Sequence, residues 1–263
     1  FFTAFIVHAL NLALRAYISG HAPWSDAYES LVYISLISVL AGVLFFKHQS
    51  FALGAASLFA SVSLLVAHLN FINPQITNLV PVLKSFWLSV HVSVITASYG
   101  FLGFGFVLGL VGLILMALKN EKNEQKLSEQ IRYLAATDEL SLNIGLSLLT
   151  VGNFLGGVWA NESWGRYWGW DSKESWSYIT IIVYAIVLHL RFIPKLRGVF
   201  AFLTASVLSF ASVLFTYFGV NFYLSGLHSY ANGESFGVSG LIYLILAALA
   251  LLIALAYRGR DIK

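Results

Sequence analysis

The sequence predicts an all-α integral membrane protein, a single polytopic bundle of about eight transmembrane helices over residues 1–263. The chain is 59% hydrophobic and 10% charged, with a mean hydropathy of +0.80, whereas soluble domains carry about 25% charged residues. It contains no cysteine, which excludes disulfides, thiolate nucleophiles and iron–sulfur centres. Nothing in this composition indicates a nucleic-acid partner.

Eight apolar runs are long enough to cross a membrane. Spanning takes about 20 apolar residues, and each span should be helical because lipid offers the backbone no hydrogen-bond partner. The runs cover 1–18, 29–47, 51–69, 90–118, 140–159, 176–193, 198–221 and 239–257. The first is short, and the fourth can tilt or project past the bilayer. The start, FFTAFIVHAL, lacks a methionine and a basic n-region, which does not fit a secretory signal and suggests a piece of a longer protein.

The basic residues predict how these spans are oriented. If the first span starts in the cytoplasm, the inner side carries eleven of the fifteen: Lys47, Lys119, Lys122, Lys126, Arg132, Arg191, Lys195, Arg197, Arg258, Arg260 and Lys263. The outer side carries Arg15, Lys84, Arg166 and Lys173. Because cytoplasmic loops are enriched in Lys and Arg, this topology places segments 20–30, 70–90, 159–176 and 221–237 on the outer face.

Two further segments have structural roles. The inner segment 119–140 alternates charge signs, which is typical of a solvated helical connector without chemistry. The run YGFLGFGFVLGLVG, at 99–112, lies inside the fourth span. There Gly105 and Gly109 would let a neighbouring helix approach closely.

The outer loop at 159–176, WANESWGRYWGWDSKESW, is the most unusual stretch. It holds five of the seven tryptophans within eighteen residues. Flat aromatic faces beside cations suit a planar apolar ligand that carries acidic groups. The candidate ligand-binding residues of this loop are Trp159, Trp164, Arg166, Tyr167, Trp168, Trp170, Asp171, Lys173, Glu174 and Trp176.

Two of the seven histidines share the outer face with this loop. His91 begins the fourth span, and His228 lies between the last two spans. Neutral imidazoles are good ligands for iron and other transition metals, and two of them can hold a planar metallocofactor from both sides. Haem fits, because its ring stacks on Trp and Tyr and its propionates pair with Arg or Lys. The sequence therefore predicts haem b as the cofactor, with His91 and His228 as iron ligands.

The other histidines divide into two groups. His189 lies near the inner end of the sixth span, and an ionisable residue at that depth is a functional candidate. It could hold the same cofactor on the inner side, or it could be a satisfied histidine beside Arg191. His8 lies in the first span and could be an intramembrane partner. His21, His48 and His68 are expected to be interfacial.

An aromatic belt and a membrane b-type cytochrome fit these residues less well. A belt at the membrane interface would spread its tryptophans over both faces, but the inner ends carry none. A membrane b-type cytochrome places histidine pairs about thirteen residues apart on two helices inside the bundle. His8 and His21 have that spacing, but His21 lies beyond the first span, and the outer pair lies at helix ends, in an open site.

Four segments carry a resemblance to a known family. WGRYWGWDSKESW, at 164–176, resembles the signature loop of the haem-handling WWD proteins of cytochrome c biogenesis. The segments at 20–31, 87–101 and 217–230 support the CcsA branch, including the CcsA portion of fused CcsBA cytochrome c synthetases. The resemblance covers nearly the whole chain. Ser172 departs from the family pattern, which usually has proline after the aspartate.

The resemblance implies a division of labour among the histidines. His91 and His228 correspond to the external iron ligands that flank the WWD loop. His189 corresponds to the intramembrane histidine that takes haem at the inner side. Its partner histidine belongs to a CcsB-type membrane partner or fused domain. The implied location is the bacterial inner membrane with the WWD loop facing the periplasm, and the thylakoid membrane is the alternative.

The resemblance also implies a reaction, which would make the chain a holocytochrome c synthase, or haem lyase, acting with its CcsB partner. Haem is exported and attached to apocytochrome c when two CXXCH thiols add across its vinyl groups, and a thioredoxin-like protein could keep those thiols reduced. Such a site works chiefly by positioning. Asp171 and Glu174 are then expected to brace the loop, or to orient a ligand imidazole, rather than act as bases.

Three alternatives stay open at this stage. A CcmC-like exporter would load haem onto a haem chaperone instead of an apocytochrome. A non-catalytic transporter or structural membrane protein would bind no haem. For Arg15 and Glu29, at the outer ends of adjacent spans, a mutual ion pair is expected, with a propionate contact of Arg15 as the alternative.

Overall fold

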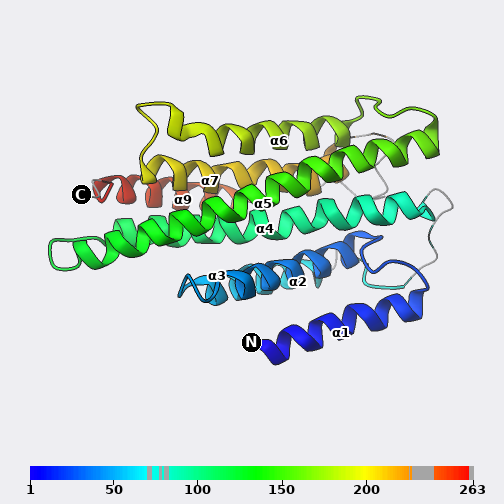
Figure 1. Ribbon diagram of the computed structural model, residues 1–263, viewed down its shortest axis with the longest axis horizontal. Coiled ribbons are helices and arrows are strands. Elements are labelled where there is room, and N and C mark those ends of the chain that lie inside the picture. Colours follow the sequence, from blue (N-terminus) through cyan, green and yellow to red (C-terminus); the bar gives the residue numbers. More distant parts are fainter. Residues whose placement is uncertain (70–72, 77–78, 80–82, 225, 227–239, 261–263) are drawn as a thin grey trace.

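The computed structural model confirms an all-helical bundle (Figure 1). It describes all residues except 70–72, 77–78, 80–82, 225, 227–239 and 261–263. The helices are α1 (Phe2–Ser19), α2 (Ala27–Phe45), α3 (Ala52–Ala67), α4 (Phe86–Ala117), α5 (Glu124–Trp164), α6 (Ser172–His189), α7 (Val199–Leu214), α8 (Val220–Tyr223) and α9 (Gly240–Arg258). A 3₁₀ turn, Leu190–Phe192, follows α6, and a π-helical turn, Phe215–Gly219, joins α7 to α8.

Every predicted span forms a helix, but the helices differ in length. Within the described residues, seven are long and apolar enough to cross a membrane, with α7, its π-turn and α8 acting as one rod, Val199–Tyr223. The third predicted span corresponds to α3, which has only 16 residues. At 1.5 Å per residue it is about 24 Å long, somewhat short of the roughly 30 Å hydrocarbon core.

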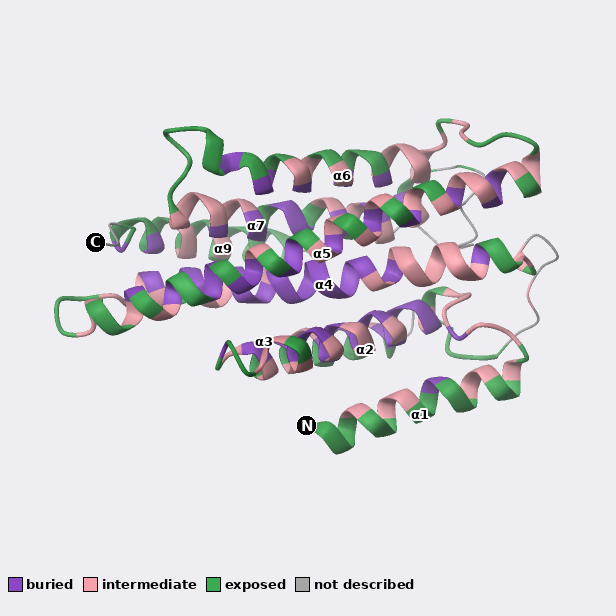
Figure 2. Cartoon of the chain, viewed as in Figure 1, coloured by how far each residue is buried: buried purple, intermediate pink, exposed green. Residues whose placement is uncertain are grey.

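The antiparallel pair α4 and α5 forms the centre of the bundle, and α4 is largely buried between its neighbours (Figure 2). Its glycines allow this. A Cβ atom at Gly105 would lie 2.6 Å from Asp138 Oδ1 on α5, and one at Gly109 would lie 2.9 Å from Val207 on α7. The expected role of Gly105 and Gly109 in close helix packing is therefore confirmed.

The outer tryptophan segment and the inner connector are both more helical than a loop. Helix α5 runs without interruption for 41 residues, or about 62 Å, and it absorbs most of segment 119–140. The expected solvated connector is therefore only partly solvated, because Ile131, Leu134 and Asp138 are buried against neighbouring helices. At its other end it includes Trp159 and Trp164, and α6 begins at Ser172. The non-helical part of segment 159–176 is thus only residues 165–171, because αL Gly165 ends α5 and Asp171 caps α6.

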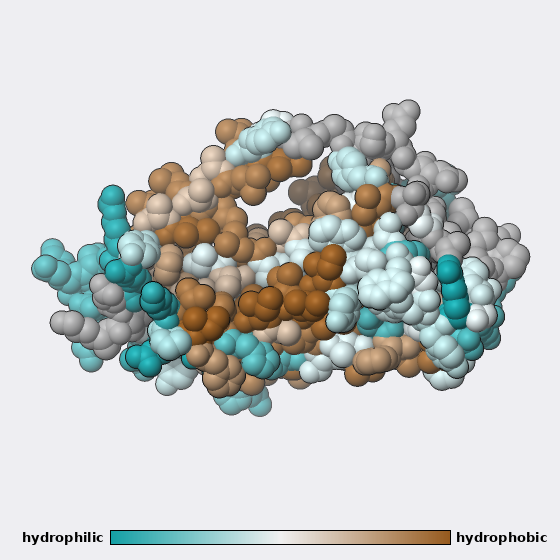
Figure 3. All heavy atoms as spheres, turned by 90° about the horizontal axis from the view of Figure 1, so that it is seen from above, coloured by the Kyte–Doolittle hydropathy of each residue, from teal (hydrophilic) through white to brown (hydrophobic). Residues whose placement is uncertain are grey.

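The two ends of the bundle differ in chemistry. The end formed by residues 20–26, 85–91 and 165–171, here called the tryptophan end, gathers segments that are far apart in sequence (Figure 1). The opposite end, here called the basic end, carries the 118–123 and 190–198 turns. Hydrophilic residues gather at both ends and apolar residues fill the middle (Figure 3). This pattern matches a helical bundle whose sides face lipid.

Helices α1 and α9 lie at the periphery, with only 6% of their residues buried. Polar contacts at two depths attach α1 to α2. The ring of His8 hydrogen-bonds the Val32 carbonyl at 3.0 Å, and Arg15 Nε donates to Glu29 Oε1 at 2.8 Å. The expected Arg15–Glu29 ion pair is confirmed, and His8 has a structural role in holding α1.

Candidate functional site

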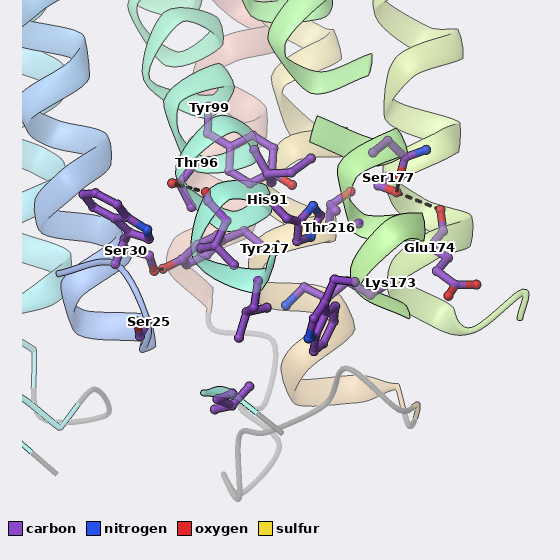
Figure 4. Close-up of a pocket in the computed structure, with 18 of the residues that line it drawn as sticks. Ser25, Ser30, His91, Thr96, Tyr99, Lys173, Glu174, Ser177, Thr216 and Tyr217 are labelled. Atoms are coloured by element: carbon purple, nitrogen blue, oxygen red, sulfur yellow. Dashed lines mark hydrogen bonds between the residues drawn. The ribbon is translucent and has the colours of Figure 1, made fainter. Parts of the chain in front are cut away.

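A cavity of about 590 Å³ opens at the tryptophan end. Its walls come from the 24–30 segment, α4, α5, the 165–171 turn, α6 and the π-turn after α7 (Figure 4). This volume is within the usual range for small-molecule sites, about 300–1,000 Å³. Of the predicted site residues it brings six together: His91, Trp159, Tyr167, Trp168, Lys173 and Glu174.

His91 projects from the second turn of α4 into the wall of this cavity (Figure 4). Its Nδ1 lies 2.7 Å from the carbonyl oxygen of Gly152 on α5. A carbonyl only accepts, so Nδ1 carries the proton and, in the neutral ring, Nε2 carries the lone pair. Metal-binding histidines usually donate their other ring N–H to a carbonyl or carboxylate in this way, which fixes the tautomer and the ring orientation.

The close approach of α5 to His91 depends on a second glycine. A Cβ at Gly156 would lie 2.6 Å from His91 Cε1. One turn further on, the nearly fully buried Trp159 stacks on the imidazole, with centroids 6.3 Å apart and planes inclined by 13°. Trp164 packs edge-on against Trp159 at 4.9 Å. These contacts hold the imidazole between two helices.

Asp171 and Glu174 form a capping box at the start of α6. Asp171 Oδ1 accepts from the backbone N–H groups of Lys173 and Glu174 at 3.0 and 2.9 Å. Glu174 Oε2 accepts in return from the N–H groups of Gly169 and Asp171, at 2.7 and 3.3 Å. The expected bracing of the loop by these two carboxylates is therefore observed. Ser172 occupies the first helical position, where proline is also favoured, so its departure from the family pattern keeps the cap intact.

Trp168 and Trp170 take different positions in the 165–171 turn. Trp170 is 72% exposed and adopts a left-handed backbone conformation, with φ of 58°. Such a conformation is costly for a residue with a Cβ. Trp168 lies edge-on to Trp170 at 5.6 Å and lines the cavity. Its indole Nε1–H is buried without a hydrogen-bond partner among the described residues.

The two loop cations are not equivalent. Lys173 lines the cavity, and its Nζ donates to Asn221 Oδ1 at 2.9 Å. Asn221 is oriented by its own bond to the Tyr217 carbonyl at 2.6 Å. Arg166 is exposed, and its guanidinium group packs against Gly169. A Cβ at Gly169 would lie 2.6 Å from the guanidinium carbon. Lys173 is therefore the cation that a ligand in the cavity would meet.

The remaining predicted residues lie elsewhere. Trp176 packs on Phe215 at 4.1 Å, outside the cavity lining. His189 is exposed at the basic end of α6, and its Nδ1 donates to the Ala185 carbonyl at 2.6 Å. His228 lies outside the described residues. Within the described part, no three His, Asp or Glu side chains are grouped so that they could hold a bare metal ion.

Sequence reasoning missed a polar wall of the cavity. Ser177 Oγ donates to Asn153 Oδ1 at 2.8 Å, and the hydroxyls of Ser30 and Tyr217 lie 2.5 Å apart (Figure 4). Tyr217 lies in the π-helical turn, a local widening that often marks functional sites. Ser30 and Tyr217 lie in segments that carry the family resemblance, but only the contacts between distant helices place these side chains in the cavity wall.

Comparison with known proteins supports the resemblance seen in the motifs. The cytochrome c assembly protein family model matches residues 24–228. NrfI from Wolinella succinogenes is 57% identical over 230 residues, which cover 88% of this chain but 25% of that protein. CcsA from Chlamydomonas reinhardtii is 39% identical over 84% of this chain and 64% of that protein. CcsA from Guillardia theta is 36% identical over 86% of this chain and 82% of that protein.

The matched region includes the cavity and the tryptophan end. The chain spans about a quarter of NrfI and just under two thirds of the algal CcsA from Chlamydomonas. The match nevertheless covers most of this chain and runs from Trp24, on the cavity wall, to His228. This chain belongs to the cytochrome c assembly protein family.

Proposed function

We propose that this chain presents haem at the tryptophan end for covalent attachment to apocytochrome c. The observation that carries the proposal is the orientation of His91, whose Nδ1–H is fixed on Gly152 in the wall of the cavity. The imidazole lone pair is then on Nε2, where iron can be bound. The names of the relatives, which describe cytochrome c biogenesis proteins, favour haem as the ligand.

The cavity has the chemistry that haem requires. Trp159, Tyr167 and Trp168 supply aromatic faces, and Lys173 supplies a cation for a propionate. Haem b would here be the substrate in transit, and the chain's residues would orient it while leaving one edge open.

His228 is the proposed second iron ligand. Gly226, two residues before it, approaches the capped start of α6, where a Cβ would lie 3.4 Å from Asp171 Oδ2. The chain therefore reaches the tryptophan end just before His228. A pair of neutral imidazoles also suits a transfer site, because the histidine of an incoming CXXCH motif can replace one of them.

His189 is the proposed inner haem ligand. Its position at the basic end of α6 and its exposed ring support a site that a second histidine completes. That histidine would come from a CcsB-type partner or fused domain. The excess of Lys and Arg at the basic end supports a cytoplasmic location for this end. The tryptophan end would then face the bacterial periplasm or the thylakoid lumen.

The proposed reaction is thioether formation. Each cysteine S–H of the CXXCH motif adds across one vinyl C=C, forming a C–S bond and a C–H bond, so no oxidant or reductant is consumed. The thiols must be reduced beforehand, which a thioredoxin-like protein could do. The protein's contribution is orientation, and good positioning alone can lower a barrier by about 7–11 kcal/mol.

Visible spectroscopy tests the haem site. We expect detergent-purified protein to show a low-spin haem spectrum that His91→Ala and His228→Ala each alter or abolish. His189→Ala should lower haem occupancy, and added hemin should restore it. A wild-type protein that stays colourless after hemin is added would contradict the proposal.

Covalent attachment tests the transferase step separately. Protein coexpressed with its CcsB partner segment and a CXXCH apocytochrome should yield haem that stays on the cytochrome after denaturing electrophoresis. If haem binds but never becomes attached, and is instead passed to a haem chaperone, the CcmC-like alternative is correct.

A further inference from the structure

Far from the cavity, a carboxyl group is buried in the middle of the bundle. Asp138 on α5 is 0% exposed, and neither carboxyl oxygen has a hydrogen-bond partner among the described residues. The same is true of two buried hydroxyls, those of Ser206 on α7 and Tyr184 on α6. Buried polar atoms are almost always paired, so these unpaired groups from three helices call for an explanation.

These groups face one another across α4. Asp138 Oδ1 would lie 2.6 Å from a Cβ at Gly105, and Ser206 Oγ would lie 3.4 Å from one at Gly109, one turn further along α4. The Ser206 hydroxyl lies near the Asp138 carboxyl, and the Tyr184 phenol lies near enough to Asp138 to be affected by a charge there. The cluster is therefore a small group of carboxyl and hydroxyl oxygens enclosed by apolar side chains such as Leu142 and Val207.

A row of hydroxyls connects this site with the cavity. Thr216 lines the cavity and lies 2.9 Å, oxygen to oxygen, from Thr180, a buried residue on α6. From Thr216 the α7 side continues through Ser212 and Ser209 to Ser206, at spacings of three or four residues, which keeps them on one helix face. Each of the first three hydroxyls donates to the backbone carbonyl of the next residue in this row, so bound water would have to join the hydroxyls. On α6, Tyr184 follows Thr180 by four residues. At 1.5 Å per residue, the ten residues from Ser206 to Thr216 span about 15 Å.

The surroundings of Asp138 contain no counter-charge. The residues that pack on it from α4 and α7 are glycine, serine and apolar side chains, and Tyr184 is the one titratable group facing it in the described part of the chain. The neighbouring Glu139 is paired with Arg191, away from the cluster. An unpaired charge within hydrocarbon is very costly, and a proton together with a few water molecules would satisfy all these oxygens.

We propose that Asp138, Ser206 and Tyr184 form an intramembrane proton-binding site that exchanges its proton with the outer cavity along the α6–α7 hydroxyls. The proton moves between the Asp138 carboxyl and cavity water through hydroxyls and bound water, so that carboxylic acid becomes carboxylate and no other bond changes. The site does not depend on haem, and the tests below use the protein without added haem.

Infrared spectroscopy tests the protonated carboxyl. We expect the difference spectrum between wild type and Asp138→Asn to contain a carboxylic-acid C=O band that shifts in D₂O. Asn has the same shape, so the variant should fold, which size-exclusion chromatography would check. If the band is absent, Asp138 is ionised and the proposal is wrong. If the band disappears when sodium is added, Asp138 binds a cation instead of a proton, and the proposal is also wrong.

Hydrogen–deuterium exchange of the same band tests the route. Thr216→Val interrupts the hydroxyl row where its α6 and α7 branches meet at the cavity, and we expect the band to shift about tenfold more slowly, which corresponds to about 1.4 kcal/mol. Thr150→Val on α5 is the matched control, because its hydroxyl donates to the Leu146 carbonyl of its own helix and does not belong to the row. Equal rates in the Thr216→Val variant and wild type would overturn the proposed route.

Discussion

His91 Nδ1 lies 2.7 Å from the carbonyl oxygen of Gly152, across the interface between α4 and α5. This one bond selects the tautomer, orients the ring and places it next to Trp159. It exists because α5 presents Gly156 where the ring approaches and Gly152 where Ile95 of α4 approaches, so the two helices pack closely enough for the imidazole to reach the α5 backbone. The packing of two helices thus prepares the proposed iron ligand.

Gly156→Ala should therefore disturb the site without removing any chemical group. Its Cβ would lie 2.6 Å from His91 Cε1, so the ring must move. We expect haem affinity to fall about 10- to 100-fold, as when the hydrogen-bond partner of a metal ligand is lost. Hemin titration measures it. Gly54→Ala is the control, because its Cβ meets nothing within 4 Å. Unchanged affinity in Gly156→Ala would show that His91 is not held as described.

The capping box predicts coupled effects at Asp171 and Glu174. Asp171→Ala should lower stability by about 0.5–2 kcal/mol through loss of the N-cap, and Glu174→Ala should free the Gly169 and Asp171 N–H groups. Because the two side chains act together, the double variant should lose less than the sum of the two single losses. Thermal unfolding measures these losses, with the exposed Glu129→Ala as control. Additive losses would contradict the coupling.

Trp170 predicts an inverted order of stability for two small residues. At its φ of 58°, Trp170→Gly should be more stable than Trp170→Ala by about 1 kcal/mol. In a right-handed helix the order is reversed. Both variants remove the same indole ring, so the comparison isolates the backbone. Melting temperatures of the two variants decide it, and a more stable alanine variant would argue against the left-handed turn.

The Arg15–Glu29 pair predicts that a variant of one residue loses more stability than the variant of both. Glu29 is 0% exposed and Arg15 is 12% exposed, so Arg15→Met leaves a buried carboxylate without its cation. We expect a loss of about 3–5 kcal/mol. Combining it with Glu29→Gln should restore much of the stability. Melting temperatures of the single and double variants test this, and equal losses would mean that the pair is not coupled.

The buried position of Asp26 predicts that the stability of the folded protein depends on pH in the acid range. Burial raises the pKa of this carboxyl, and its bond to the Glu29 N–H and the nearby Arg15 only partly oppose that shift. The folded state therefore keeps a proton that the unfolded state loses near pH 4. Stability from this group should be present below that pH and lost as pH rises through the folded pKa. Asp26→Asn keeps the N-cap and should remove this loss. The measurement is the melting temperature of wild type and of Asp26→Asn from pH 4 to 7. If the two melting temperatures change in parallel with pH, the predicted contribution of Asp26 is wrong.

The membrane class, the approximate helices and the polar ends were predictable from the sequence. The length of an apolar run and the positions of Lys and Arg are properties of the linear chain, and lipid makes a helix of each run. The roles of Asp171 and Glu174 were predictable for the same reason, because a capping box joins residues only three apart.

Helix lengths were harder to predict, because hydropathy does not mark where capping ends a helix. The 159–176 segment therefore contains a turn of only seven residues, and Trp176 packs on Phe215 rather than in the cavity. The α3 helix is shorter than its apolar run for the same reason.

The site itself was decided by tertiary structure. Sequence alone identified His91, the tryptophans and Lys173 as candidates. Only the packed bundle brings Gly152 to His91, Asn221 to Lys173 and Asn153 to Ser177. Only the bundle encloses Asp138 with Ser206 and Tyr184. The physical reason is that hydrophobicity and charge act on each span separately. A binding site instead depends on distances between spans, and these are set by the close packing of the helices.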